Sequence, residues 1–251
     1  MEFGVAVIGC GDLGTSHADV WSSRPDAKVL TVFDPQGDRG KALAEKHNAR
    51  ACTSYQQAID SDVVNVVSVC TPTCMHSEIS CYAAAGGRHV LSEKPVALTL
   101  EQADAMISAA AAHNVQVAVS YQFRGAPSCR RYRSLFLDGQ FGGPLFARFV
   151  DIREVRPKLA MHRESMNGGP VIDMGGHYFD LMRFITDAEP LRVSASGHVF
   201  GQGKQRLSGI DDLAVDAAEV LVEFSHGHVL STNINWGMPE GFPEALLHFG
   251  G

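Results

Sequence analysis

Residues 3–119 show a repeating pattern in which short apolar runs alternate with longer stretches of helical periodicity. The apolar runs occupy residues 3–9, 28–34, 62–70, 89–95 and 115–121, and the helix-period stretches occupy residues 14–23, 37–48, 76–86 and 100–114. Runs such as VVNVVSV are apolar on both faces, which is typical of parallel strands covered by helices. The pattern predicts a doubly wound parallel sheet of the α/β class.

The pattern changes after Tyr121. A helical stretch at about residues 127–138 precedes a long extended run at 145–155 and a glycine-punctuated helix that begins near residue 168. Period-two segments then follow at residues 198–203, 214–225 and 228–236, with Gly-bearing turns such as SHGH between them. Alternation of this kind predicts an α+β domain on an open, mostly antiparallel sheet. We therefore expect two domains, residues 1–120 and residues 121–251.

Composition and charge narrow the class of partner. The 251 residues are 45% hydrophobic and 20% charged, and no apolar run approaches the roughly 18 residues of a membrane span. The formal charge is −7, and Arg130, Arg131 and Arg133 form the one basic cluster. Nucleic-acid binders usually present a basic face. We expect a small-molecule partner, with no nucleic acid and no membrane.

The start of the chain and its cysteines indicate a reducing compartment. Met1 is followed within two residues by FGVAVIG, with no basic segment or cleavable apolar segment of a secretion signal. Six cysteines, at positions 10, 52, 70, 74, 81 and 129, form no CxxC pair. Scattered cysteines of this kind suit free thiols. A cytoplasmic location is the resulting expectation.

The first candidate site is a glycine-rich turn between a buried strand and a helix. Val5–Ile8 forms the strand run, and the turn contains Gly9, Gly11, Asp12, Leu13 and Gly14. In a GxGxxG turn the first glycine allows the tight bend, the second admits a pyrophosphate, and the third lets helix and strand pack closely. The N–H groups that begin the helix then face the phosphates. This context predicts dinucleotide binding, the alternative being a glycine turn in a nucleotide-free α/β protein.

A carboxylate in register with this turn specifies the cofactor. Asp34 follows the next strand run, twenty residues after Gly14. A carboxylate there can accept hydrogen bonds from both adenosine ribose hydroxyls, and it repels a ribose 2′-phosphate. The sequence therefore predicts NAD rather than NADP, although Arg39 can partly offset that repulsion.

Two further patches follow later strands, and the carboxyl ends of strands are where open α/β sheets bind ligands. The first is VCTPTCMH at residues 69–76, which contributes Thr71, Pro72 and His76 as candidate cofactor contacts. A Thr-Pro turn with Thr73 as N-cap of the next helix is compatible with this role, and His76 is either a substrate contact or a solvated residue in the first turn of that helix.

The second patch is Ser92-Glu93-Lys94-Pro95, in which Glu93 and Lys94 are candidate cofactor contacts. An ammonium group near a cationic nicotinamide ring can have a lowered pKa and can hold or polarise a substrate hydroxyl. The alternative is a surface lysine. Its position at a strand end, the flanking Glu93 and a proline that can be cis all favour a functional Lys94.

The stretch GGPVIDMGGHYFD at residues 168–180 places a carboxylate and an imidazole one helical turn apart. Asp173 and His177 share a face with Asp180 and Phe184, beside an apolar stripe of Met174, Tyr178, Leu181 and Ile185. Gly175 and Gly176 each weaken a helix interior by about 1 kcal/mol relative to Ala. We interpret them as clearance for a ligand, the alternative being an i,i+4 polar pair on a solvated face.

The remaining candidates are ambiguous from sequence alone. His226 and His228 flank Gly227 in an expected hairpin turn and are interpreted as solvated turn residues, so no metal site is expected. Arg124, Arg153 and Trp236 are candidates for the substrate site that sequence cannot separate from surface or core roles.

Taken in order and spacing, these motifs resemble the glucose-fructose oxidoreductase and myo-inositol dehydrogenase family, the Gfo/Idh/MocA-like oxidoreductases. The glycine turn, Asp34, CTPTCMH, SEKP, the FGGP turn and GGPVIDMGGHYFD carry the resemblance, which extends over essentially the whole chain. It implies a Rossmann domain that binds NAD(P) at residues 1–120 and a substrate and oligomerisation domain at residues 121–251. It also implies a homodimer or homotetramer, and it makes Lys94, Asp173 and His177 the catalytic set.

The resemblance implies hydride transfer at the carbinol carbon of a sugar, inositol or related polyol. Whether His177 or Lys94 takes the hydroxyl proton stays open, and Asp173 either positions His177 or binds a neighbouring hydroxyl. Family members are usually longer, so we expect a C-terminally short second domain. A NAD-dependent glycoside hydrolase and a non-catalytic NAD-binding regulator are the alternative functions.

Overall fold

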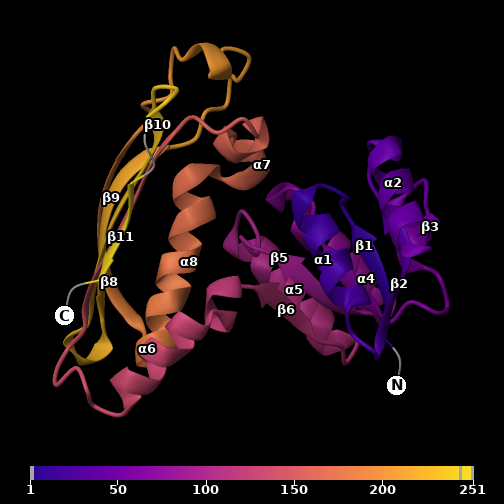
Figure 1. The fold of residues 1–251 in the computed structure, drawn as a ribbon, viewed down its shortest axis with the longest axis horizontal. Helices are drawn as coiled ribbons and strands as arrows, with labels where there is room; N and C mark the ends of the chain where they lie inside the picture. Colours follow the sequence, from indigo (N-terminus) through magenta and orange to yellow (C-terminus); the bar gives the residue numbers. More distant parts are fainter. Residues whose placement is uncertain (1–2, 243–244, 250–251) are drawn as a thin grey trace. The chain divides into compact units, whose positions relative to one another are not determined.

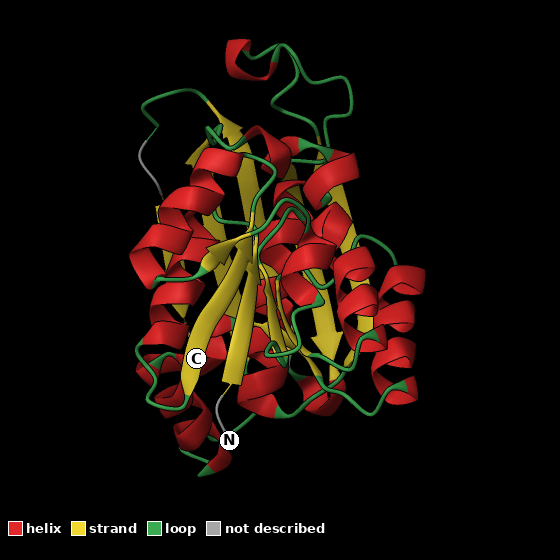
Figure 2. Cartoon of the chain, turned by 90° about the vertical axis from the view of Figure 1, so that its right-hand side faces the viewer, coloured by secondary structure: helices red, strands yellow, loops and turns green. Residues whose placement is uncertain are grey.

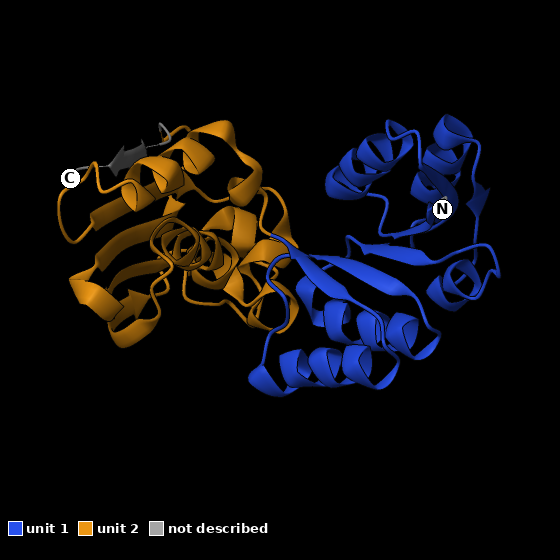
Figure 3. Ribbon diagram, turned by 90° about the horizontal axis from the view of Figure 1, so that it is seen from below, with its two compact units in different colours: residues 1–120 blue, residues 121–251 orange. Residues whose placement is uncertain are grey.

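The computed structural model describes residues 3–242 and 245–249, and the chain divides into two compact units, Met1–Ser120 and Tyr121–Gly251 (Figure 3). Among the described residues, the first unit contains two clusters of buried apolar side chains and the second contains one.

A six-stranded parallel sheet organises the first unit. Its strands are β1 (Phe3–Ile8), β2 (Ala27–Phe33), β3 (Arg50–Ala51), β4 (Val66–Val69), β5 (His89–Glu93) and β6 (Val117–Ser120). They lie in the order β3-β2-β1-β4-β5-β6, and every neighbouring pair is parallel. This is the strand order of a dinucleotide-binding doubly wound sheet. The predicted architecture is confirmed.

Helices cover both faces of this sheet (Figure 2). They are α1 (Asp12–Ser22), α2 (Gly37–His47), α3 (Tyr55–Ile59), α4 (His76–Ala85) and α5 (Leu100–Ala112). Side chains alternate along the central strand: Val5 and Val7 pack with Ala18 of α1 and Leu43 of α2, whereas Ile8 belongs to the cluster that includes α3 and α4. Burial on both faces explains why this strand has an uninterrupted apolar sequence.

The second unit packs one long helix on a five-stranded sheet (Figure 1). Its elements are α6 (Pro127–Leu137), β7 (Phe146–Glu154), α7 (Glu164–Asn167), α8 (Gly169–Thr186), β8 (Pro190–His198), β9 (Ala217–Phe224), β10 (Val229–Met238) and β11 (Ala245–Phe249). The order is β11-β7-β10-β9-β8, with β7 and β10 parallel and the other pairs antiparallel. A mixed, mostly antiparallel sheet is confirmed.

Helix α8 lies against the buried face of this sheet. Tyr178, Leu181 and Ile185 join Phe149 and Trp236 in one apolar cluster, and the Phe149 and Tyr178 rings stack with centroids 4.5 Å apart. Burial alternates along β9 and β10, which leaves the other face of the sheet more exposed. The predicted apolar stripe of the helix is therefore the face that packs on the sheet.

The strand expected at residues 198–203 is wrong. The strand is β8, Pro190–His198, and its residues are exposed on both faces. Leu191, Val193 and Ala195 alternate with polar residues along β8, but the predicted strand began at His198, where this alternation ends. The expected strands at 145–155, 214–225 and 228–236 agree with β7, β9 and β10 within a few residues.

Candidate active site

The glycine turn after β1 has the geometry that its three glycines predict. Gly9 adopts a φ of +92°, and a Cβ on it would lie 2.6 Å from the carbonyl oxygen of Cys70. A Cβ on Gly14 would lie 1.8 Å from the Gly9 carbonyl oxygen, so only glycine lets α1 pack this closely on the turn. A Cβ on Gly11 would meet nothing within 4 Å.

Open space at Gly11 fits a pyrophosphate group. Gly11 is the N-cap of α1 and no side chain caps the helix there. The first N–H groups of a helix need acceptors and carry its positive end, which suits an anion. Asp12 and Leu13 occupy the first turn, and Leu13 is half exposed. The residues present therefore fit a dinucleotide, and the cofactor contacts of this turn stay a prediction.

Asp34 lies beside this turn with its carboxylate fixed. It follows β2, is 9% exposed, and accepts hydrogen bonds from the N–H groups of Cys10 (2.7 Å) and Gln36 (2.8 Å). A carboxylate has about four acceptor positions, so it can still bind ribose hydroxyls. Burial, together with the Asp34 charge, raises the pKa of the Cys10 thiol to about 12, so this thiol is neutral at physiological pH.

His76 is part of the support for the loops that follow β4 and β5. It begins α4 but is 1% exposed, so a solvated position is wrong. Its Nδ1 lies 2.7 Å from the carbonyl oxygen of Pro95 and its Nε2 lies 2.9 Å from that of Thr71. Burial lowers the pKa of His76 below its ordinary value, despite these two contacts. A direct contact of His76, Thr71 or Pro72 with a cofactor stays a prediction.

The predicted helix cap in this loop is wrong. Thr73 lies inside a short 3-10 turn, Thr73–Met75, and the N-cap residue of α4 is Met75. The chain therefore makes one more turn before α4 begins than a Thr N-cap would require.

Lys94 directly follows β5, where the sequence placed it. It is half-buried, and its peptide bond to Pro95 is cis. The Lys94 N–H donates to Oε2 of Glu93 at 3.2 Å, and Glu93 is only 4% exposed. A second residue, His17 of α1, bonds Oε1 of the same carboxylate at 2.9 Å. Sequence reasoning missed His17, whose one available signal was its position one turn after Gly14.

In the second unit, α8 carries Asp173 and His177. Gly168 caps the helix with a φ of +73°, and Pro170 occupies its first turn, a position that tolerates the missing N–H. Asp173 and His177 are each 3% exposed, so the alternative of a solvated polar pair is wrong. The His177 ring lies 4.7 Å from the Phe123 ring and 6.0 Å from the Tyr121 ring, measured between centroids.

The interpretation of Gly175 as clearance for a ligand is also wrong. A Cβ on Gly175 would lie 3.1 Å from the Phe179 ring and 3.8 Å from Ile234 of β10. The missing side chain therefore makes room for the Phe179 ring of the same helix and for the sheet. A Cβ on Gly176 would make ordinary contact with Tyr121, 3.6 Å from the hydroxyl oxygen.

Arg124 precedes α6 in the chain and binds Asp180, which lies on α8 three residues after His177. Its Nε and Nη2 donate to the two carboxylate oxygens of Asp180 at 2.8 and 2.5 Å, and its guanidinium lies 5.5 Å from the centre of the Phe184 ring. The other two candidates differ. Trp236 is a core residue at 1% exposure, and Arg153 stacks on its ring at 5.3 Å while pairing with buried Asp151.

The two histidines of the β9–β10 turn have different positions. His226 is exposed, with a φ of +63°, as expected. His228 is 6% exposed, accepts a hydrogen bond from the Leu145 N–H at 3.0 Å and packs edge-on against Phe136, so its solvated assignment is wrong. Within residues 3–242 and 245–249 no group of three metal-ligating side chains is arranged around a common point.

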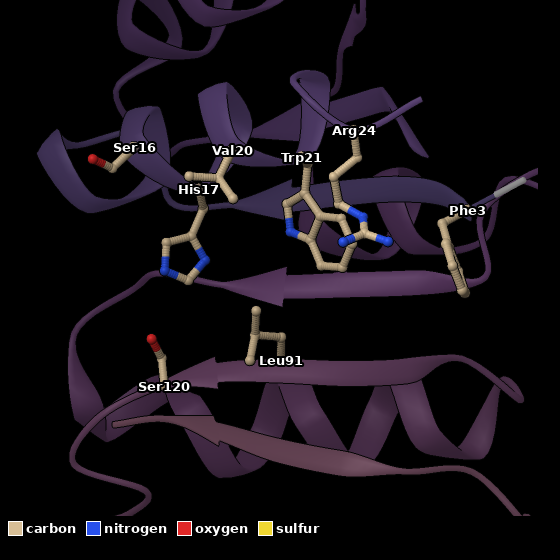
Figure 4. Close-up of a pocket in the computed structure, with 8 residues that line it drawn as sticks. All are labelled: Phe3, Ser16, His17, Val20, Trp21, Arg24, Leu91 and Ser120. Carbon is tan, nitrogen blue, oxygen red and sulfur yellow. The ribbon is translucent and has the colours of Figure 1, made fainter. Parts of the chain in front are cut away.

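A cavity of about 470 Å³ lies in the first unit, over the face of the sheet next to α1 (Figure 4). It is lined by Phe3, Ser16, His17, Val20, Trp21, Arg24, Leu91 and Ser120.

No helix in the described part of the chain has the length and apolarity needed to cross a bilayer. All six cysteines are free thiols.

Comparison with protein families decides the relationship. Residues 3–121 match the family described as "Oxidoreductase family, NAD-binding Rossmann fold", and residues 129–249 match the "GFO/IDH/MocA C-terminal domain". The chain belongs to the Gfo/Idh/MocA oxidoreductase family. Membership confirms the predicted family and fold class, and it confirms NAD as the cofactor class of the first unit.

Individual relatives agree with this assignment. The chain is 30% identical to the myo-inositol 2-dehydrogenase of Thermotoga maritima over 224 residues, which are 89% of this chain and 65% of the relative. It is 30% identical to the 1,5-anhydro-D-fructose reductase of Ensifer adhaerens over 189 residues, 74% of this chain and 56% of the relative.

Among solved structures, GenD2 from gentamicin A biosynthesis, in complex with NAD, matches with a TM-score of 0.85 at 29% identity. That match covers 98% of this chain and 68% of GenD2. Against the first curated relatives, the chain spans between 56% and 70% of their length.

Proposed function

We propose that this chain transfers a hydride between the carbinol carbon of a sugar, inositol or related polyol and a nicotinamide cofactor, with NAD preferred over NADP. The observation that carries the proposal is the space at Gly11 beside the fixed carboxylate of Asp34, in a family whose Rossmann unit binds NAD. Relatives named as inositol dehydrogenases and a sugar reductase support the substrate class.

Asp34 selects the cofactor. Its carboxylate keeps acceptor positions for two ribose hydroxyls, whereas a 2′-phosphate would bring a second negative charge against a side chain that is 9% exposed. Two like charges in a partly desolvated position repel strongly. Arg39 is exposed, so solvent screens its attraction for a phosphate.

Three side chains perform the proton chemistry in this proposal. When bound, the nicotinamide accepts or donates the hydride. His177 takes the hydroxyl proton as general base, because a neutral imidazole has one ring nitrogen that can accept a proton. Lys94 hydrogen-bonds the same hydroxyl and stabilises the developing alkoxide, and Asp173, one helical turn before His177, orients the imidazole or binds a neighbouring hydroxyl.

The surroundings of His177 support its role as a base. Two aromatic rings, those of Tyr121 and Phe123, lie within 6.0 Å of its ring centroid. Aromatic walls restrict the ring to few orientations and keep bulk water away from it. Arg124 is held by Asp180, which lies on the same helix as His177. The remaining N–H groups of Arg124 are suited to bind the hydroxyls of a polyol.

We also propose a cytoplasmic homodimer or homotetramer. Leu191 and Val193 share one face of the edge strand β8, and they are 73% and 61% exposed. An apolar sheet surface of this kind marks an association site. Light scattering coupled to gel filtration tests it, with a monomer at working concentration as the contrary result.

Nucleotide binding and turnover test the function in sequence. The chain is titrated with NAD⁺ and NADP⁺, and then incubated with a panel of sugars and inositols while NADH is followed by its absorbance. Lys94→Ala and His177→Ala should lower kcat by about 100-fold or more while NAD⁺ still binds. Exposed His113 supplies the control, because His113→Gln should change neither quantity.

The alternative functions give different results in the same experiment. Sugar release without net NADH indicates the glycoside hydrolase, and NAD⁺ binding without turnover on any polyol indicates the regulator. Failure to bind either nucleotide contradicts both catalytic functions. Full turnover of His177→Ala at saturating substrate contradicts its assignment as the base.

A further inference from the structure

Glu93 is a buried carboxylate whose donors come from several elements of the first unit. Its Oε1 lies 2.9 Å from Nε2 of His17 on α1, and its Oε2 accepts the Lys94 N–H at 3.2 Å. Burial alone raises the pKa of Glu93, but hydrogen bonds and charge from His17, with help from the Ser120 hydroxyl, hold it below its ordinary value. The carboxylate is therefore ionised and depends on these donors.

His17 is itself fixed on both sides of its ring. Nδ1 lies 2.7 Å from the hydroxyl of Ser68 on β4, and Ser68 is fully buried. The Ser68 hydroxyl can donate to Nδ1 or accept from it, so the two contacts fix the orientation of the ring in either protonation state. Figure 4 shows the ring extending from α1 toward the strands of the sheet, at the border of the cavity.

The two chain neighbours of Lys94 are thus both held by histidines. Glu93, which precedes it, is bonded by His17, and the carbonyl of Pro95, which follows it, is bonded by His76. His17 has a special position, because it lies on α1 one turn after Gly14. The helix that begins at the glycine turn is therefore linked through one imidazole to the segment that carries Lys94.

We propose that His17 is a positioning residue that holds Lys94 through Glu93 and so couples the glycine turn to the lysine. The inference rests on the proposed function, in which Lys94 contacts the reacting hydroxyl. Removing the ring leaves a buried carboxylate with one donor fewer. Glu93 then rotates toward other donors or takes up a proton, and its hold on the Lys94 N–H is lost.

Four ionisable groups among the described residues lie close enough to Glu93 to interact with its charge. They are His17 from α1, Cys70 after β4, His76 from α4 and Lys94 itself. Burial, and then the Glu93 charge, raises the pKa of the Cys70 thiol to about 12, so Cys70 stays neutral in the working range. His17 is then the residue whose removal changes the protonation of Glu93.

Kinetics of five variants test the coupling. His17→Ala should lower kcat about tenfold or more, as expected for a displaced catalytic group, while the dissociation constant of NAD⁺ changes less than about threefold. His17→Gln keeps an N–H donor near the position of Nε2 and should restore most of kcat. In a Glu93→Gln background, His17→Ala should have little further effect, because the two residues act as one unit. His113→Gln is the matched control.

The pH profile separates positioning from a general loss of stability. In His17→Ala the acid limb of kcat should move to higher pH, because the pKa of Glu93 rises when its strongest donor is removed. Thermal unfolding is measured for each variant. Glu93→Gln keeps the side-chain volume and tests the same contact from the other partner.

A second readout does not depend on activity. Reductive ¹³C-methylation of the lysines gives one NMR resonance per dimethylamino group, and Lys94→Arg identifies that of Lys94. The resonance should shift in His17→Ala, return toward its original position in His17→Gln, and stay unchanged in His113→Gln. An unshifted Lys94 resonance together with wild-type kcat in His17→Ala overturns the inference.

Lys94→Ala distinguishes a failure of the proposed function from a failure of the inference about His17. If it retains turnover, the proposed role of Lys94 fails, and the resonance alone decides whether His17 positions this residue. If Lys94→Ala loses turnover but His17→Ala does not, only the inference about His17 fails.

Discussion

Gly11 and Gly14 lie in the same turn, yet substitution by alanine should affect them in opposite ways. The Cβ of Gly14→Ala would lie 1.8 Å from the Gly9 carbonyl oxygen, in backbone that cannot rotate away. Relieving this overlap requires α1 to move off the turn, at a cost of about 2–4 kcal/mol. The better helix propensity of Ala returns about 1 kcal/mol. We expect a net loss of about 1–3 kcal/mol in the free energy of unfolding.

Gly11→Ala should leave the fold almost unchanged. Gly11 has a φ of −74° and a ψ of −163°, which alanine adopts freely, and its Cβ would meet nothing. Loss of a favourable N-cap residue and the smaller entropy of the unfolded chain nearly cancel, so stability should change by less than about 1 kcal/mol. The added methyl group occupies the space assigned to the pyrophosphate. We expect NAD⁺ affinity to fall at least about tenfold, or 1.4 kcal/mol.

Urea unfolding and calorimetric titration with NAD⁺, each on both variants and the parent chain, measure these two quantities. The expected result is a separation: stability lost mainly in Gly14→Ala, and affinity lost in Gly11→Ala at nearly unchanged stability. Wild-type NAD⁺ affinity in Gly11→Ala would refute the assignment of that space. Equal losses of stability in the two variants would refute the steric argument.

Three further predictions concern charge. Asp34→Asn should reduce the preference for NAD⁺ over NADP⁺ by about tenfold, since it removes the charge that repels a 2′-phosphate. Paired titrations measure the ratio of the two dissociation constants, and an unchanged ratio contradicts the role of Asp34. Asp180→Asn should cost about 1 kcal/mol of stability, because the half-exposed Arg124 loses its bidentate partner. Urea unfolding with Arg124→Gln as the second arm of a double-mutant cycle checks this, and additive effects would show no pairing. Burial lowers the pKa values of His76 and His162 below 6.5, so the unfolded chain binds more protons than the folded one below that pH. The free energy of unfolding should therefore be unaffected by these histidines above about pH 6.5 and should fall with acidification, by at most about 1.4 kcal/mol per pH unit for each histidine. His162→Gln should reduce this slope. A free energy of unfolding that stays constant between pH 6.5 and about 5 contradicts the reasoning.

The first unit could be predicted almost completely because its signals are local. Parallel strands covered on both faces must be apolar throughout, and a glycine turn that admits a pyrophosphate leaves a fixed spacing in the sequence. The same logic located Asp34 and Lys94 at the ends of strands. The second unit was predicted less well: β8 alternates at Leu191, Val193 and Ala195, yet the strand was placed at residues 198–203.

The errors concern contacts between residues far apart in the chain. Gly175 permits the approach of Phe179 and Ile234, and a glycine looks the same in sequence whether its neighbour is a ligand or a side chain. His228 looked like a turn residue, but it is buried against Phe136. The bond between His17 and Glu93 joins residues 76 positions apart, which no local pattern reveals.

Direct transfer of a labelled hydride tests the central claim most directly. A polyol that gives turnover is prepared with deuterium on the carbinol carbon and incubated with NAD⁺ and the chain, and the NADH formed is examined by mass spectrometry and proton NMR. We expect deuterium at C4 of the nicotinamide, on one face of the ring, and a transfer rate that falls together with kcat in Lys94→Ala and His177→Ala. Unlabelled NADH, or label found only in solvent, would contradict hydride transfer by this chain.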